Sequence, residues 1–195
     1  RFSKDKSMCM LGMKQWLTLE EPSTNSFTCT YMMNGFISTI LSAICTRLDI
    51  YIAKYMHFSG SCFFINKAMF EAVGLFDESV FLYGEEDDIH YRLKHHFKDC
   101  KMVYDKSLRY LHLTKERQPD IKYEKMLIDV AVKQNKKKDY SEQKTLKNRL
   151  RCINLQIIRE RLRIMHGKNN RTLLYMLEEL KLYIKEKLQS RKQLK

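Results

Sequence analysis

The spacing of hydrophobic positions changes several times along the chain, and each spacing predicts a different element. Between residues 36 and 56 apolar residues recur every four positions, which indicates one or two amphipathic helices packed in the core: Phe36, Ile40, Ile44, Leu48 and Ile52. Residues 61–65 form a short continuous apolar run, typical of a buried strand. Residues 8–19 fit either a strand or a short helix.

Local signals divide the middle of the chain further. Asn66 is a suitable N-cap for a helix over residues 67–73, and Gly74 suits the left-handed position that follows a helix end. A second helix is expected from the acidic residues at 85 to about Phe97. Two strands, 101–104 and 109–113, should follow, joined by a turn at Asp105, Lys106 and Ser107.

The last third of the chain is helical in pattern. A helix is expected over residues 121–132, and the lysines at 136–138 should break it. Asp139 and Glu142 can form a capping box for a long helix that ends near Gly167. Leucines and isoleucines from 173 to 188 mark a further helix, so an antiparallel hairpin is predicted. The expected organisation is an α/β domain over residues 1–118 and a helical appendage over residues 119–195.

The positive charge is concentrated in that appendage. Residues 1–118 carry 15 Lys and Arg against 14 Asp and Glu, whereas residues 119–195 carry 21 against 9. An excess of this kind indicates an anionic partner, such as an acidic membrane surface or nucleic acid. The basic residues are scattered around amphipathic helices without a nucleic-acid motif, so nucleic acid is not expected. Packing on the domain or on a second copy of the chain is the other interpretation of these helices.

The cysteines and the apolar runs indicate a cytoplasmic setting. Six cysteines, at positions 9, 29, 45, 62, 100 and 152, show no CxxC pair and are predicted to be unpaired thiols. No secretory signal is visible. The longest apolar run, residues 36–45, is about half of the ~20 residues that a membrane-spanning helix needs.

The candidate chemistry lies in the acidic cluster of residues 85–88. Carboxylates in a first helical turn are stabilised by the helix dipole, by about 0.3–1 kcal/mol each, which suffices to explain most such clusters. Glu86 precedes Ile89 and Leu93 by three and seven positions, so it falls on the inward face. Removing an inward-facing carboxylate from water costs free energy, so such a group is expected to have a polar partner or a functional role. Asp88 can pair with Arg92, and Asp87 is expected to be solvated.

Residues 59–112 resemble the C-terminal half of family-2 glycosyltransferases of the GT-A fold, especially rhamnosyltransferase-like enzymes of surface polysaccharide synthesis. The matching motifs occur in the family's order: Gly60, Val73-Gly74, Phe76-Asp77-Glu78, Phe81 and Tyr83, the cluster 85–88 with Arg92, and His112. The resemblance covers about fifty residues. It implies that the chain contains the C-terminal part of a GT-A-type mixed sheet with helices.

The resemblance also implies roles for single residues. Glu86 would be the general base of an inverting hexosyl transfer from a nucleotide-sugar donor to a glycan or lipid-linked acceptor, with Glu85 and Asp88 beside it. Gly60 and Asp77 would lie on the acceptor side, and Arg92 would join them as a substrate-binding residue. Asp88 would orient the helix start or the acceptor through its link to Arg92. His112 would help to hold a divalent cation, Mg²⁺ or Mn²⁺, at the donor diphosphate. A lone strand histidine is otherwise usually structural.

The N-terminal part departs from the family pattern. Residues 1–58 contain no Asp-x-Asp and no predicted strand–helix–strand series, so the donor-binding half is missing from them. The chain is therefore expected to be the C-terminal portion of an enzyme, with its basic tail at the inner face of a membrane. The alternatives are an inactive remnant, a subunit that completes another chain, or a basic nucleic-acid-binding protein.

Overall fold

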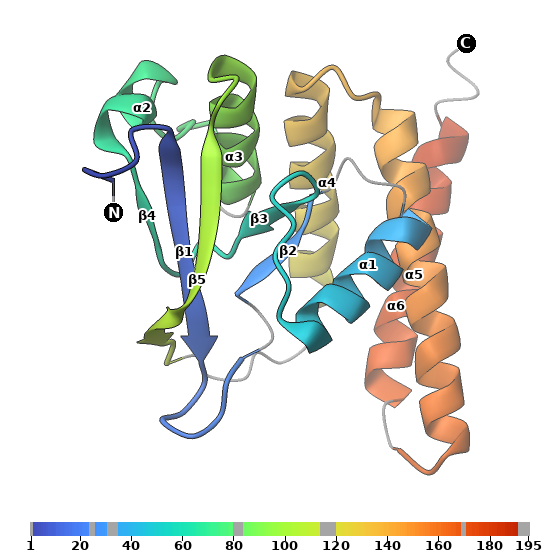
Figure 1. Ribbon diagram of the computed structural model, residues 1–195. Helices are drawn as coiled ribbons and strands as arrows, with labels where there is room; N and C mark the ends of the chain where they lie inside the picture. Colours follow the sequence, from blue (N-terminus) through green and yellow to red (C-terminus); the bar gives the residue numbers. More distant parts are fainter. Residues whose placement is uncertain are drawn as a thin grey trace. The chain divides into compact units, whose positions relative to one another are not determined.

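A computed structural model describes residues 2–23, 26–30, 35–79, 84–113, 120–168 and 171–190. The predicted aromatic residues Phe81 and Tyr83 lie outside these ranges. The chain divides into two compact units, one of residues 1–30 with 41–115 and one of residues 31–40 with 116–195 (Figure 1). The expected α/β class is confirmed, because a small mixed sheet occurs together with several helices.

The first unit is built on a three-stranded sheet with the order β4–β1–β5 (Figure 1). β1 (Met8–Trp16) lies in the middle, antiparallel to β4 (Phe63–Ile65) and parallel to β5 (Lys101–Leu111). Most residues of β1 are buried, as expected for a central strand. The N-terminal apolar segment is therefore a strand. A strand within residues 61–65 is confirmed, but its predicted burial is wrong, because β4 lies at the edge of the sheet and Phe64 is 52% exposed.

β5 corrects the prediction of two strands, because residues 101–111 form a single one. Its pairing with β1 jumps from Asp105 opposite Met13 to Arg109 opposite Lys14. The predicted turn is present as a bulge, in which the Asp105 carboxylate accepts hydrogen bonds from the backbone N–H (2.9 Å) and the hydroxyl (2.7 Å) of Ser107. The bulge absorbs the extra residues while the strand pairs with β1 on either side of it.

A second, two-stranded sheet pairs β2 (Phe27–Cys29) antiparallel with β3 (Met56–Phe58). With the helix between them, these strands form the strand–helix–strand series that the sequence pattern did not reveal in residues 1–58. The ring of Phe58 lies so close to β1 that a Cβ added at Gly12 would clash with it. Glycine at position 12 therefore permits this close approach.

Two helices of the first unit begin and end as their local signals predict. α2 (Lys67–Ala72) is capped by Asn66, whose side chain accepts a hydrogen bond from the Met69 N–H at 3.3 Å. Gly74 has a φ of +85°, which confirms the left-handed position. α3 (Glu85–His96) starts at the acidic cluster. Its inward residues Ile89 and Leu93 are fully buried.

The core of this unit joins the sheet, the β2–β3 pair, α3 and the end of α1 (Gly35–Leu48). Its buried members are Cys9, Met10, Phe27, Cys45, Met56, Phe58, Ile89, Leu93 and Met102. Methionine is well represented in this set, and its flexible side chain fills irregular gaps between strands and helix.

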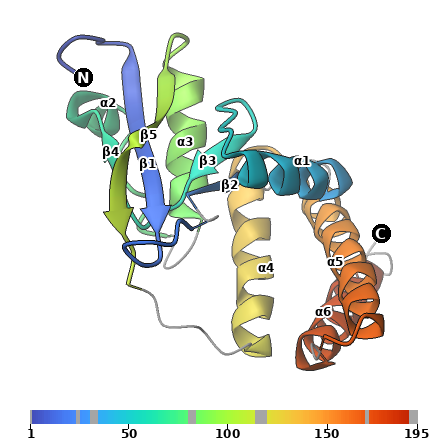
Figure 2. The ribbon, with the colours of Figure 1, turned by 60° about the horizontal axis from the view of Figure 1, so that its bottom comes forward.

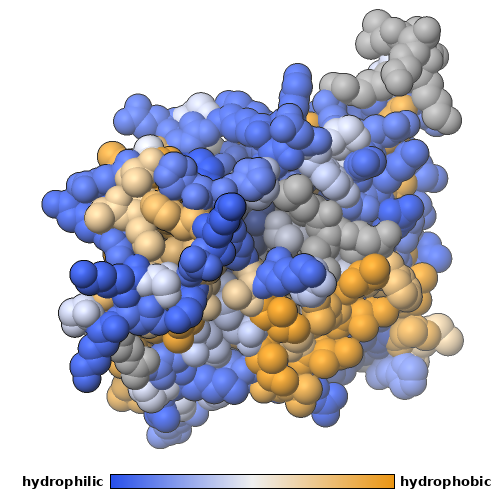
Figure 3. Space-filling view, turned by 45° about the horizontal axis from the view of Figure 1, so that its top comes forward, coloured by the Kyte–Doolittle hydropathy of each residue, from blue (hydrophilic) through white to orange (hydrophobic). Residues whose placement is uncertain are grey.

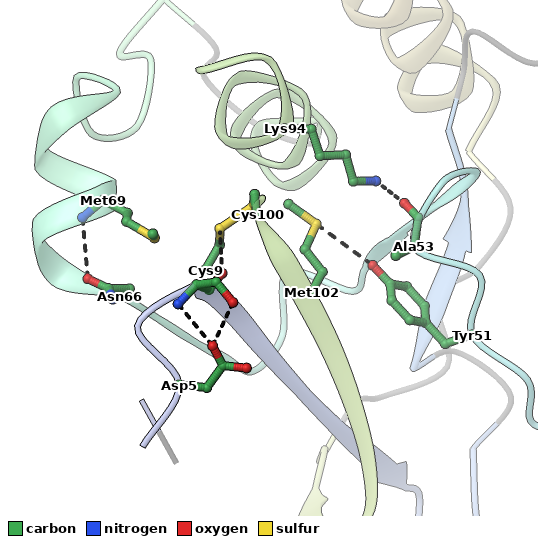
Figure 4. The surroundings of a disulfide bond; sticks show 10 residues. Asp5, Cys9, Tyr51, Ala53, Asn66, Met69, Lys94, Cys100 and Met102 are labelled. Atoms are coloured by element: carbon green, nitrogen blue, oxygen red, sulfur yellow. Dashed lines mark hydrogen bonds between the residues drawn. A yellow bond between two sulfur atoms is a disulfide. The ribbon is translucent and has the colours of Figure 1, made fainter. Parts of the chain in front are cut away.

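Cys9 and Cys100 correct the prediction that all six cysteines are unpaired. They form a disulfide between β1 and the residue that precedes β5 (Figure 4). The two residues are 91 positions apart in the sequence, but parallel pairing sets Met8 opposite Lys101 and so brings them together. Spacing along the chain could not reveal a pair that the sheet register creates.

α1 (Gly35–Leu48) ends before residue 56, and the division between the two units falls within it, after Ile40. The stripe that predicted a core helix lies largely on the surface: Phe36, Ile40, Ile44 and Leu48 are each 43–58% exposed. Ile52, which follows the helix, is partly buried against the core. Cys45, on the opposite side, is buried. Figure 3 shows a large hydrophobic area (orange) on the face that carries this helix. The spacing identified the apolar face correctly, but the fold covers the other face.

The second unit contains α4 (Ile121–Lys137), α5 (Glu142–Met165) and α6 (Arg171–Ser190). α5 and α6 form the predicted antiparallel hairpin (Figure 2), and Arg161 of α5 lies 2.6 Å from Glu178 of α6. The core of the unit consists of aliphatic side chains from all three helices: Ile128, Leu146, Ile153, Ile157, Leu177, Leu180 and Ile184. Leu177, Leu180 and Ile184 lie in the leucine and isoleucine pattern predicted for residues 173–188.

The ends of these helices depart from the predictions. α4 continues five residues past Val132 and ends at Lys137, because lysines in a last turn are compatible with the helix dipole. The predicted capping box at Asp139 is wrong. Ser141 is the N-cap of α5, and its hydroxyl accepts a hydrogen bond from the Lys144 N–H at 3.3 Å.

None of the helices within the described ranges has both the length and the apolar character needed to cross a bilayer.

Candidate functional site

Glu86 lies in the first turn of α3, beside the loop that joins β3 to β4. Its carboxylate is half-buried and accepts a hydrogen bond from the Gly84 N–H at 3.3 Å. A Cβ added at Gly60 would lie 3.5 Å from one carboxylate oxygen of Glu86 and 3.7 Å from the other. The two residues that the sequence singled out, 26 positions apart, therefore meet in space. The loop backbone at Gly60 therefore lies close to the Glu86 carboxylate.

Polar side chains from three elements gather next to this loop. Ser61 lies 2.5 Å from the phenol oxygen of Tyr110 in β5, and that phenol donates to the side-chain oxygen of Gln15 in β1 at 3.0 Å. The Ser61 hydroxyl also lies 3.1 Å from that of Ser59. Burial raises the pKa of the Tyr110 phenol, although its hydrogen bond with Ser61 acts in the opposite direction. The phenol therefore remains a neutral hydrogen-bonding group near pH 7.

The location of this network follows from the parallel pairing of β1 and β5. Gln15 and Tyr110 are opposite each other near the carboxyl ends of the two strands. In α/β folds, ligands bind outside the carboxyl ends of parallel strands. The hydroxyl and amide groups of this network are thus at the sheet edge where a ligand is expected.

His112 follows β5 directly, at the same edge. Its backbone N–H donates to the Trp16 carbonyl at 2.9 Å, and its ring centroid lies 6.4 Å from that of Tyr110. The sheet therefore sets His112 beside the Ser61–Tyr110–Gln15 network.

The described residues do not form a complete metal site. Within the ranges that the structure covers, no group of three His, Cys, Asp or Glu side chains is placed to hold an ion. His112 is the single expected ligand.

Asp88 and Arg92 form the predicted pair, with 2.8 Å between the Arg92 Nε and a carboxylate oxygen of buried Asp88. The guanidinium also donates to the backbone carbonyls of Val73 and, at 2.6 Å, of Leu75. Arg92 therefore connects α3 to the chain that leaves α2. This arrangement orients the start of α3, on which Glu86 lies.

Asp87 corrects the prediction of a solvated carboxylate. It is 3% exposed, and a carboxylate oxygen lies 3.3 Å from the Nδ1 of buried His57 in β3. The helix pattern placed Asp87 off the apolar stripe, but the β2–β3 pair covers that side of α3. A buried carboxylate needs such a partner to offset its desolvation.

His90 is a second buried histidine in the same region. Its Nε2 accepts a hydrogen bond from the Phe58 N–H at 3.1 Å, and its Nδ1 lies 2.7 Å from the Glu86 carbonyl oxygen. Because one ring nitrogen must accept while the other donates, the ring is neutral. Burial and the nearby His57 hold the pKa of His90 well below its usual range.

Lys94, one turn further along α3, donates to the carbonyl of Ala53 (Figure 4). Burial lowers the pKa of Lys94 to about 8, although Asp87 acts in the opposite direction. These contacts attach α3 to the loop before β3. The histidine pair, the Asp87 carboxylate and Lys94 therefore support the helix that carries Glu86.

The two remaining predicted residues have separate surroundings. Glu85 is half-buried at the first position of α3. The Asp77 carboxylate accepts hydrogen bonds from the backbone N–H (2.9 Å) and the hydroxyl (2.7 Å) of Ser79, so it stabilises a turn.

Sequence reasoning missed Gln15, Ser61 and Tyr110, although some signals were present. Gln15 lies in a largely apolar segment and indicates a buried polar group with a partner, although Lys14 lies next to it. Ser59 and Ser61 flank the predicted Gly60. Tyr110 gave no signal of its own.

Comparison of the chain with protein-family models, with curated proteins and with solved structures finds no match.

Proposed function

We propose that this chain is an inverting glycosyltransferase, or the C-terminal portion of one, in which Glu86 is the general base. The approach of Gly60 to the Glu86 carboxylate carries the proposal. It sets a half-buried carboxylate beside the loop that carries the Ser61 hydroxyl, and a positioned carboxylate of this kind is suited to deprotonate a sugar hydroxyl. The motif order of residues 59–112 adds support through its resemblance to family-2 enzymes of the GT-A fold.

The reaction is a single displacement. Glu86 removes the proton of the acceptor hydroxyl while the acceptor oxygen bonds to the anomeric carbon of the donor sugar. The bond from that carbon to the diphosphate oxygen breaks, and the nucleoside diphosphate leaves with the electron pair. Inversion at the anomeric carbon follows, because attack and departure occur on opposite faces.

The other residues act on the acceptor or on Glu86. Ser61, Tyr110 and Gln15 are suited to hydrogen-bond a polyhydroxylated acceptor, and Gly60 provides room for it. Asp88 and Arg92 are positioning residues for the first turn of α3, and Glu85 and Asp77 border the same region of the sequence motif. A divalent cation, Mg²⁺ or Mn²⁺ at His112, is an expectation from the resemblance. The described residues supply one ligand for it, so no step above depends on a metal.

The donor would be a nucleotide sugar, and the acceptor a glycan or a lipid-linked saccharide of cell-surface polysaccharide synthesis. A peripheral position at the inner face of a membrane agrees with the positive charge of residues 119–195. Donor binding is expected to require residues other than those in positions 1–195, supplied by a longer reading frame or by a partner chain.

The test is transfer from a panel of nucleotide sugars, measured with the longest chain that the reading frame around Arg1 encodes. Glu86→Gln keeps the size and the hydrogen-bonding capacity of the side chain but removes the base. We expect transfer to fall by about 10²- to 10⁴-fold, the usual contribution of a general base.

Glu71→Gln is the matched control, because it makes the same change at an exposed carboxylate of α2 that pairs only loosely with Lys67. Both variants should melt like the parent protein. Transfer that survives Glu86→Gln would rule out Glu86 as the base. Absence of transfer in the parent protein, with recovery on adding a chain that carries an Asp-x-Asp donor site, would instead identify this chain as a subunit.

A further inference from the structure

α5 carries an apolar stripe near its carboxyl end that the helical unit leaves uncovered. Leu155, Ile158, Leu162 and Met165 follow one another at spacings of three and four, so they share one side of the helix. Ile158 is 55% exposed, Leu162 51% and Met165 79%. Their more deeply buried neighbours on the helix, Ile153 and Ile157, belong to the core of the unit. The stripe is therefore a second apolar face, separate from the one that holds the hairpin together.

The stripe lines a shallow hollow of about 370 Å³. Leu155, Ile158 and Leu162 contribute its apolar part, and Arg159, Arg163 and Lys168 border it. A second hollow adjoins it at Lys168 and reaches Arg171. Cations thus accompany the apolar residues along the end of α5 and into the turn that follows.

These cations are only partly neutralised inside the protein. The buried carboxylate of Glu160 lies 2.8 Å from Arg159 and 3.2 Å from Arg163. The side chains of both arginines remain about half exposed, at 58% and 45%. One carboxylate cannot balance the two arginines and Lys168, so the border of the hollow retains a positive charge. Glu160 instead fixes the two guanidinium groups beside the stripe.

The chemistry of this surface identifies its partner. A hollow that offers aliphatic side chains and bordering cations matches a lipid surface with acyl chains and anionic headgroups. Nucleic acid shares the negative charge, but its bases stack on aromatic side chains, and the apolar residues here are aliphatic. A second copy of the chain would bring the same positive surface, and residues 119–195 already carry 21 Lys and Arg against 9 Asp and Glu. Repulsion disfavours that pairing.

We propose that this part of α5, from Leu155 to Lys168, docks on an anionic lipid bilayer. The aliphatic stripe enters the region between headgroups and acyl chains, while Arg159, Arg163 and Lys168 contact the phosphate and carboxylate groups of the lipids. The helix lies along the surface and does not cross it. This docking does not depend on glycosyl transfer, and it assigns membrane attachment to a defined surface of the helical unit.

The test is co-sedimentation of the purified full chain with vesicles of phosphatidylcholine, with and without phosphatidylserine. We expect binding to the vesicles that contain phosphatidylserine and at least about tenfold weaker binding to pure phosphatidylcholine. Leu162→Glu and Ile158→Glu should each weaken binding by about tenfold or more. Each removes an aliphatic group that would enter the bilayer and adds a negative charge that the anionic headgroups repel. Lys168→Glu should weaken it and reduce its dependence on salt.

Leu182→Glu is the matched control, because Leu182 is a 56% exposed leucine of α6 that does not line the hollow. It should bind vesicles like the parent protein, and the helical circular dichroism of all variants should melt alike. Absence of binding at low salt would overturn the proposal, as would binding that survives both Leu162→Glu and Ile158→Glu. If duplex DNA at equal charge displaces the protein from the vesicles, the surface would be reassigned to nucleic acid. If the protein forms a dimer that Leu162→Glu dissociates, it would be reassigned to a second copy of the chain.

Discussion

His90 shows how one buried side chain can link two elements. Its Nε2 binds the backbone of Phe58 in β3, and its Nδ1 binds the carbonyl of Glu86 in its own helix. The contact with Phe58 requires the neutral ring, because protonation of Nε2 would place a proton where the Phe58 N–H must donate. The histidine therefore holds the Glu86 turn against β3 only while it is uncharged.

This requirement predicts that acid destabilises the protein through His90. Its pKa is depressed in the folded state by burial, whereas in the unfolded chain it lies near the ordinary value of about 6.5. Between these two values the unfolded chain binds a proton that the folded one does not. Stability is therefore complete above pH ~6.5 and falls as the pH decreases below it, by up to about 1.4 kcal/mol per pH unit.

Urea unfolding at a series of pH values measures this slope. His90→Gln removes the titrating group, so the variant should be less stable near neutral pH but should lose less stability on acidification. His95→Gln, at an exposed position of the same helix, is the control and should leave the slope unchanged. An equal slope in the parent protein and in His90→Gln would assign the acid sensitivity to other groups.

At the scale of elements, α1 and α3 are both amphipathic, but the fold uses their apolar faces differently. α3 directs Ile89 and Leu93 into the core, where both are fully buried. α1 leaves Ile40 and Ile44 about half exposed and contributes Cys45 to the core instead. Equivalent spacing thus leads to opposite outcomes, because the neighbouring strands, and not the helix itself, determine which face is covered.

Substitutions on the apolar faces of α1 and α3 should have different effects on the free energy of unfolding. Ile44→Gln keeps a good helix former at an exposed position, so the free energy of unfolding should change by less than about 0.5 kcal/mol. Leu93→Ala leaves a cavity in the core and should cost about 2–5 kcal/mol. Thermal or urea unfolding measures both. A comparable loss in Ile44→Gln would show that the face of α1 is covered in solution.

At the scale of the whole molecule, the residues that the structure describes form two hydrophobic cores, and no buried residue belongs to both. One joins the sheet, the β2–β3 pair and α3, and the other lies among α4, α5 and α6. A core supplies most of the stabilisation of the elements around it. The two units are therefore expected to respond separately to damage in either core.

Amide hydrogen exchange can test whether the two units unfold independently. Ile153→Ala should destabilise the helical core by about 2–5 kcal/mol and accelerate amide exchange in α4, α5 and α6, with little change in β1 and α3. Ile89→Ala should have the reciprocal effect. Equal acceleration in both units by either variant would show that they unfold as one cooperative structure.

The sequence alone determined the features that depend on neighbours along the chain. The Asn66 cap, the left-handed Gly74, the start of α3 at the acidic cluster and the α5–α6 hairpin were all predictable, because capping, backbone sterics and helical periodicity act within a few residues. The Asp88–Arg92 pair belongs to the same class, since positions i and i+4 face each other on any helix.

Only the tertiary structure decided which distant residues meet. The parallel register of β1 and β5 joins Cys9 to Cys100 and sets Gln15 beside Tyr110. The β2–β3 pair covers Asp87, and the loop after β3 brings Gly60 to Glu86. The physical reason is that strand register and the covered side of a helix arise from packing between segments far apart in the chain, and no local pattern records that packing.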